Sequence, residues 1–188
     1  MDELTLELLL KQITGDDPHQ RTEAWQSAGA IGAPAMMPLS KLAAGADLEV
    51  RRAAVRAMWK IVRTAGAPHG DVEAKQAVNQ ALLAVLKDSP SDTVSRDVLW
   101  MLSELACGEC AVDAVAELLK VEPLREDARC CLERIPGEES LAALQSALTS
   151  VPAEFQLAVA QSLRARGVDV DEAKYPCQKL VPARETEA

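Results

Sequence analysis

Aromatic residues are scarce in this chain of 188 residues: they make up 3%, as three tryptophans, one tyrosine and one phenylalanine. Strands favour aromatic and β-branched side chains, whereas helices favour alanine and leucine. Because alanine and leucine supply much of the 48% hydrophobic content, the composition argues against an all-β fold. The hydrophobic content is ample for a core, which argues against wholesale disorder.

An excess of positive charge is also missing, since 20 lysines and arginines face 29 acidic residues, for a net charge of -9. Nucleic-acid-binding proteins usually carry a basic footprint, and anionic lipid attracts basic segments. The acidity therefore argues against nucleic acid and membrane surfaces as partners. No apolar run approaches the roughly 20 residues of a membrane helix, and the residues after Met1 lack the basic start of a signal peptide. Five cysteines, an odd number, favour reduced thiols and a cytoplasmic location.

Sequence motifs for catalysis are missing as well. There is no glycine-rich phosphate loop and no Gly-x-Ser-x-Gly elbow. His19 and His69 fall near predicted helix starts, and neither has another histidine at the i, i+4 spacing of a metal site. The sequence therefore predicts no catalytic residue, no cofactor-binding residue and no metal ligand, and indicates that the protein is not an enzyme.

Helical periodicity is what the chain has in abundance. Between the glycines and prolines, apolar residues recur every three or four positions. Asp17 before Pro18 and Ser89 before Pro90 are predicted N-caps. The pattern predicts helices at about 2–14, 18–31, 34–44, 47–65, 71–88, 91–107, 110–121, 123–135, 138–150 and 153–166.

An internal repeat runs through these helices. Small or aliphatic residues recur in one column about 30 residues apart, except for one step of 44 between Ala54 and Val98. A second column lies four residues further along in each unit. The first column holds Ala24, Ala54, Val98, Ala128 and Val159, and the second holds Ala28, Met58, Leu102, Leu132 and Leu163.

The repeat is clearest at Ile31-Gly32-Ala33-Pro34-Ala35 and at Asp47-Leu48-Glu49-Val50-Arg51-Arg52-Ala53-Ala54. These stretches resemble the HEAT-repeat family, in its short bacterial form. The resemblance implies an all-α superhelix of about five helix-pair units, the last incomplete, with first helices on the convex face and second helices on the concave face. The expected domain spans 1–170, with helix 2–14 as an N-terminal cap, and the expected tail spans 171–188 and is partly disordered. The apolar residues after Gly167 are expected to fold over the open end of the last unit: Val168, Val170, Tyr175, Leu180 and Val181.

The cysteines allow two interpretations. Cys107-Gly108-Glu109-Cys110 has the spacing of a metal or redox site, and Cys130-Cys131 follows. In the repeat alignment the two groups lie six helical positions apart, about 9 Å along the axis. The offset favours ordinary packing, with zinc binding or redox chemistry as the alternative.

Two surfaces are candidate binding sites for another protein. The polar, acidic side of the second helices would accept a basic or amide-rich peptide. Outward tryptophans and arginines on the first helices have the composition of binding hot spots, although their rings can instead pack flat between helices under arginine stems. The concave candidates are Glu73, Gln76, Gln80, Asp113 and Glu117, and the convex candidates are Arg52, Arg56, Trp59, Arg96 and Trp100.

These features favour a non-catalytic scaffold that binds a partner protein or peptide. The family resemblance leaves two alternatives. One is an enzyme subunit similar to the phycobilin lyases, which attach bilins to cysteines of partner proteins. The other is a DNA-binding or repair protein similar to HEAT-like glycosylases, which the net charge of -9 opposes.

Overall fold

The protein is seen in a computed structural model that describes residues 5–105 and 109–177. Within these ranges the chain forms ten α-helices and two short 3-10 turns, with no strand. The predicted all-α solenoid is confirmed. None of the helices in these ranges has the length and apolar character needed to cross a lipid bilayer.

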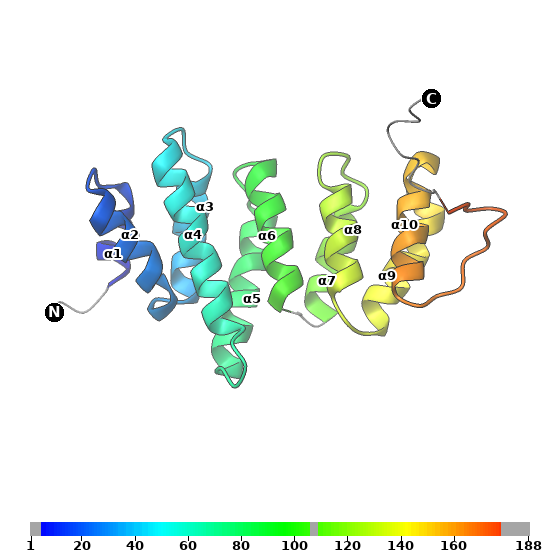
Figure 1. The fold of residues 1–188 in the computed structure, drawn as a ribbon, viewed down its shortest axis with the longest axis horizontal. Coiled ribbons are helices and arrows are strands. Elements are labelled where there is room, and N and C mark those ends of the chain that lie inside the picture. Colours follow the sequence, from blue (N-terminus) through cyan, green and yellow to red (C-terminus); the bar gives the residue numbers. More distant parts are fainter. Residues whose placement is uncertain (1–4, 106–108, 178–188) are drawn as a thin grey trace, which may run out of the picture.

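The helices stand in two parallel rows along the long axis of the molecule (Figure 1). Each helix packs against a chain neighbour in the other row, and from α2 onward each packs against the next helix of its own row, whereas α1 packs against α2 and α4. The odd row contains α1 (Leu6–Thr14), α3 (Met36–Ala43), α5 (Val72–Lys87), α7 (Glu109–Leu118) and α9 (Glu138–Ser150). The even row contains α2 (Pro18–Ser27), α4 (Leu48–Ala65), α6 (Asp92–Leu105), α8 (Arg125–Arg134) and α10 (Ala153–Ala165).

The number of units depends on where counting begins. Counted from α2, as the repeat columns suggest, α10 has no following partner helix within the described residues. Counted from α1, which packs against α2, the helices form five pairs. In either description a single helix pair buries its apolar stripe only by stacking on its neighbours.

Aspartates begin several of the helices. The side chains of Asp17, Asp47 and Asp71 accept hydrogen bonds from backbone N–H groups in the first turns of α2, α4 and α5. Such caps satisfy donors that have no partner within the helix. The N-cap predicted at Ser89 is wrong, because Ser91 accepts the bond from the Val94 amide at 3.3 Å. Ser89 instead donates to the carbonyl of Ser91.

The repeat columns form the core between the rows. Every residue of both columns is at most 1% exposed. The predicted helix 18–31 ends early, at Ser27, and continues as a 3-10 turn from Ala28 to Ala30. At Gly29 a Cβ atom would lie only 2.3 Å from the Thr64 hydroxyl, so only glycine permits the turn to approach α4 this closely.

The segment after α10 packs back onto the solenoid. Gly167 adopts a left-handed φ of 79°, which redirects the chain at the end of α10. Val170 and Tyr175 are then buried at 7% exposure each. This agrees with the expectation that apolar residues after Gly167 cover the end of the array. The proposed boundary at 170 remains a prediction, and Leu180 and Val181 lie outside the described residues.

Candidate functional site

The predicted acidic surface lies on the odd row. Glu73, Gln76 and Gln80 project from α5, and Asp113 and Glu117 project from α7; all five are exposed. The two α7 residues line a hollow of about 400 Å³ between α7 and α9. The three α5 residues do not line this hollow. Within it, Lys120 forms an ion pair with Glu117 at 2.8 Å, which offsets part of the acidity.

The longest helix, α4, carries most of the predicted convex candidates. It has five basic side chains and one acidic side chain, a local excess of four positive charges in a chain of net charge -9. Of the five cations, only Arg52 forms an ion pair within the described residues, with Glu49 at 2.9 Å. We define the α4 basic surface as these cations and the two indole rings beside them: Arg51, Arg52, Arg56, Lys60, Arg63, Trp25 and Trp59.

The two rings of the α4 basic surface lie under arginines. The guanidinium carbon of Arg56 is 5.8 Å from the centroid of the Trp25 ring, and that of Arg63 is 5.2 Å from the centroid of the Trp59 ring. Both distances fall in the cation–π range. Both tryptophans are half-buried, which agrees with the interpretation that the rings pack in grooves under arginine stems.

Three surface hollows surround the outward side of α4. Trp25, Arg56, Trp59, Lys60 and Arg63 line the first, of about 350 Å³. Arg56 also lines a second hollow of about 420 Å³ toward α6, and Arg63 also lines a third of about 260 Å³. Arg56 therefore lies between the first and second hollows, and Arg63 lies between the first and third.

Trp25 is the aromatic residue of this surface that the sequence did not predict, and the cations Arg51 and Lys60 were not among the predicted candidates either. The indole nitrogen of Trp25 is buried and has no hydrogen-bond partner among the described residues. Trp25 follows Ala24 of the first repeat column, and the ring faces the neighbouring helix α4, where Arg56 covers it. This position, one residue after a core column, is the feature of the sequence that could have identified Trp25. A side chain there points along the row toward the next unit.

The second predicted pair, Arg96 and Trp100 on α6, is engaged by α8. The indole N–H of Trp100 donates to Asp127 at 3.1 Å, and Arg134 lies over the same ring at 5.5 Å. Arg96 donates twice to the carbonyl of Pro123 and forms an ion pair with Asp127 at 3.5 Å. The convex candidates thus fall into two groups, and the group on α6 connects α6 to the next unit.

Between α6 and α8 carboxylates are crowded as well. Asp97 is partly buried, and this burial raises the pKa of its carboxyl, with a further rise from the charge of Asp127. Asp97 also lines the hollow beside Arg51, Arg52 and Arg56 of α4.

One cation of α8 is held by carboxylates within the protein. Arg129, whose side chain is 12% exposed, forms ion pairs with Glu126 and with Glu133 and donates to Ser162 of α10. Burial by itself lowers the pKa of Arg129, but hydrogen bonding to Glu126 and the nearby carboxylates more than offset this, so the pKa is raised. The guanidinium is therefore fixed as a cation within a closed network.

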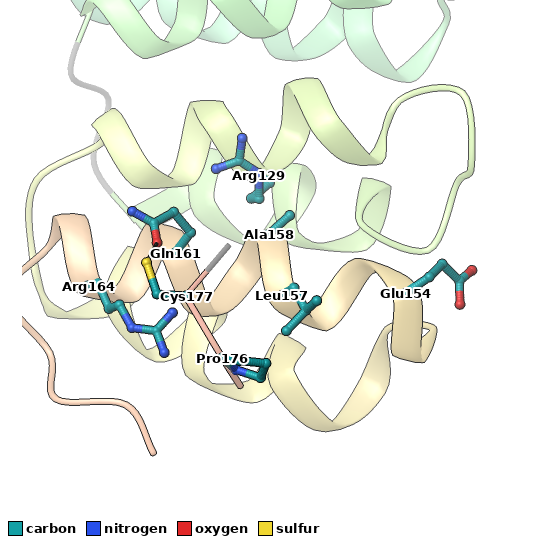
Figure 2. Close-up of a pocket in the computed structure, with 8 residues that line it drawn as sticks. All are labelled: Arg129, Glu154, Leu157, Ala158, Gln161, Arg164, Pro176 and Cys177. Atoms are coloured by element: carbon teal, nitrogen blue, oxygen red, sulfur yellow. Dashed lines mark hydrogen bonds between the residues drawn. The ribbon is translucent and has the colours of Figure 1, made fainter. Parts of the chain in front are cut away.

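A hollow of about 390 Å³ lies between α8, α10 and the C-terminal segment. Figure 2 shows Arg129 reaching it from α8, Gln161 and Arg164 from α10, and Cys177 beside Gln161. Arg164 donates to the backbone carbonyl of Tyr175 and Arg129 is held by its carboxylates. Both guanidinium groups therefore have partners within the protein.

The cysteine alternatives are only partly visible. Cys107 and the side chain of Cys110 lie outside the described residues. Cys131 is buried in the core. Cys130 is half-buried beside Arg129; burial raises the pKa of its thiol, Arg129 lowers it, and Glu126 raises it again, for a net rise. Among the described residues, no group of three or more histidine, cysteine or acidic side chains is arranged to hold a metal ion.

The fold and these surfaces define an α-helical repeat protein of the solenoid class. No protein-family model matches the sequence, and comparison with curated proteins gives no match. Among solved structures, an engineered protein from a structural genomics programme is 22% identical with a TM-score of 0.45, over 87% of this chain and 79% of that one. A designed armadillo repeat protein is 18% identical with a TM-score of 0.36, over 86% of this chain and 99% of that one. With TM-scores this low, the assignment to the solenoid class rests on the helix packing of this chain itself.

Proposed function

We propose that this protein is a non-catalytic interaction scaffold that binds a partner protein or peptide on the surface of its solenoid. The observation that carries this proposal is the α4 basic surface. There, arginines and tryptophans, the residue types richest in binding hot spots, surround adjacent hollows on a rigid stack of helices. The family-level part of the proposal is that the repeats are of the HEAT type, for which the support is the motif at 31–54.

The acidic side of the odd row is a second candidate surface. The hollow between α7 and α9 supports it, because Asp113, Glu117 and Glu139 line a recess wide enough for a side chain of a partner. Its natural occupant is a basic segment. Glu73, Gln76 and Gln80 would extend this surface along α5, as neighbours of the recess rather than as part of it.

Capture of partners from a lysate of the source cells tests the scaffold function. Wild-type protein is compared with two exposed charge reversals, Arg56→Glu with Lys60→Glu on the even row and Glu73→Lys with Glu117→Lys on the odd row. We expect a protein to co-purify in a stoichiometric amount and to be lost with one of the two variants. If no stoichiometric partner appears, or if it is retained by both variants, the proposed scaffold surfaces are wrong.

A further inference from the structure

Most cations of the α4 basic surface have no ion-pair partner among the described residues; the exception is Arg52, which pairs with Glu49. Arg56, Lys60 and Arg63 make no ion pair within the described residues, although carboxylates outnumber cations in the whole chain. On α8, by contrast, Arg129 is enclosed by Glu126 and Glu133. A cluster of unpaired cations attracts anionic groups and raises the rate at which an acidic partner arrives.

The hollows around α4 add an apolar requirement. Two indole rings line the first hollow. Leu48, Val55 and Ala43 supply the apolar lining of the second, and Leu48 is 44% exposed. Asp97 of α6 also lines this second hollow, but it forms no ion pair with Arg56. Arg56 stands between the two hollows because it lines both. An occupant that fits this alternation carries carboxylates at the level of Arg56 and apolar or aromatic side chains on either side.

The Trp25 indole gives a second reason for an anionic occupant. Its N–H is buried with no acceptor among the described residues, and the guanidinium of Arg56 lies over the face of the ring. A buried donor without a partner is destabilising. An occupant that supplied an acceptor to this N–H would remove that cost.

We infer that the α4 basic surface is the docking site for a short acidic segment of a partner protein, one with an aromatic or large apolar side chain among its carboxylates. This inference rests on the proposed scaffold function and specifies its partner. The extent of the surface favours a peptide over nucleic acid. A phosphate backbone needs a continuous track of cations, but the next even helix, α6, carries Asp92, Asp97 and Glu104 and ends the track.

Fluorescence anisotropy tests the inference with a fluorescein-labelled peptide of glutamates around a central phenylalanine. We expect saturable binding that weakens as salt is added, because the cations involved are exposed. Arg56→Glu with Lys60→Glu should weaken binding by at least about tenfold, the scale of one lost hot spot. The matched control, Lys41→Glu with Lys87→Glu, changes the charge equally but on exposed lysines of the odd row, and should bind within about twofold of wild type. Circular dichroism should show both variants folded, because all four side chains are exposed.

Two further probes separate the contributions. Replacing the phenylalanine by alanine should weaken binding by about fivefold, through loss of an anchor in a hollow. A peptide with lysine in place of each glutamate should not bind. A single-stranded oligonucleotide of similar length should bind more weakly than the acidic peptide.

Several results would overturn the inference: no saturable binding up to about 100 µM peptide, equal loss with the odd-row control, equal binding of the lysine peptide, or tighter binding of the oligonucleotide. Failure here is distinct from failure of the scaffold function. If the lysate partner is lost only with Glu73→Lys and Glu117→Lys, the scaffold stands and the acidic-segment inference falls. If no lysate partner exists, the scaffold itself falls.

Discussion

Two tryptophan sites on the same row of helices, one on α4 and one on α6, have opposite electrostatic surroundings. Around Trp100, the carboxylate of Asp127 accepts the indole N–H and pairs with Arg96, so that α6 and α8 satisfy each other. Around Trp25 and Trp59, Arg56 and Arg63 lie over the rings. Neither of these arginines forms an ion pair with a carboxylate among the described residues. Tryptophan and arginine therefore contact a carboxylate of the next helix in the middle of the array, between α6 and α8. Near the beginning of the array, at α2 and α4, the same residue types have no such carboxylate contact among the described residues. The open site is where a partner can supply what is missing.

The largest expected difference is between an arginine of the closed region and one of the open region. The side chain of Arg129 is only 12% exposed. Arg129→Ala leaves two carboxylates and a serine hydroxyl without this cation. We expect it to lower the free energy of unfolding by about 2–3 kcal/mol. Arg56→Ala removes an exposed side chain and should cost no more than about 0.5 kcal/mol. Urea unfolding measures both changes in free energy, provided that its dependence on urea concentration has the same slope in wild type and variants. Equal losses for the two variants would contradict the comparison.

A smaller difference is expected when each indole loses its N–H. Trp100→Phe removes the donor to Asp127 and should destabilise the protein by about 1 kcal/mol more than the change in ring size alone. Trp25→Phe removes a buried N–H that has no acceptor among the described residues. Loss of this unsatisfied donor offsets the loss of buried ring area, so the free energy of unfolding should change by no more than about 0.5 kcal/mol. The same urea experiment checks this, and a Trp25 variant as destabilised as the Trp100 variant would contradict it.

The smallest effect concerns the crowded carboxylates between α6 and α8. Because burial and Asp127 raise the pKa of Asp97, its ionised form is disfavoured in the folded state. The contribution of Asp97 to the free energy of unfolding is then fully present below the ordinary carboxyl pKa, and it is lost as the pH rises through the raised pKa of Asp97. Asp97→Asn should therefore raise the thermal midpoint slightly at pH 7 and leave it unchanged at acidic pH.

Asp113→Asn, on α7, serves as the control, because the side chain of Asp113 is exposed. It should not reproduce the pH-dependent gain. An equal rise in the thermal midpoint of the control variant would contradict this account. So would a rise for Asp97→Asn that persists at acidic pH.

Much of the architecture follows from the sequence because it depends on local spacing. The two repeat columns, from Ala24 to Leu163, identify the core of the even row, since side chains three or four residues apart share one helix face. Asp17 predicts the start of α2 for the same local reason. The early end of that helix at Ser27 was not predictable, because it depends on the distant approach of Gly29 to Thr64.

The candidate site was predictable only in part. Helical projection places Arg56 and Trp59 outward, and the structure agrees. It also places Arg96 and Trp100 outward, but it does not show that Asp127 and Pro123 from the next unit, about 30 residues away, engage them. Which arginines keep a free charge is decided by contacts between units, and a single helix wheel contains no such contacts.

The three indole N–H groups allow the central claim to be tested in one spectrum. In a two-dimensional ¹H–¹⁵N correlation spectrum the chain has three indole signals, one for each tryptophan. On titration with the glutamate–phenylalanine peptide, we predict that the signals of Trp25 and Trp59 move and that the signal of Trp100, bonded to Asp127, stays in place. Movement of the Trp100 signal alone, or of none of the three, would contradict the assignment of the binding site to α4.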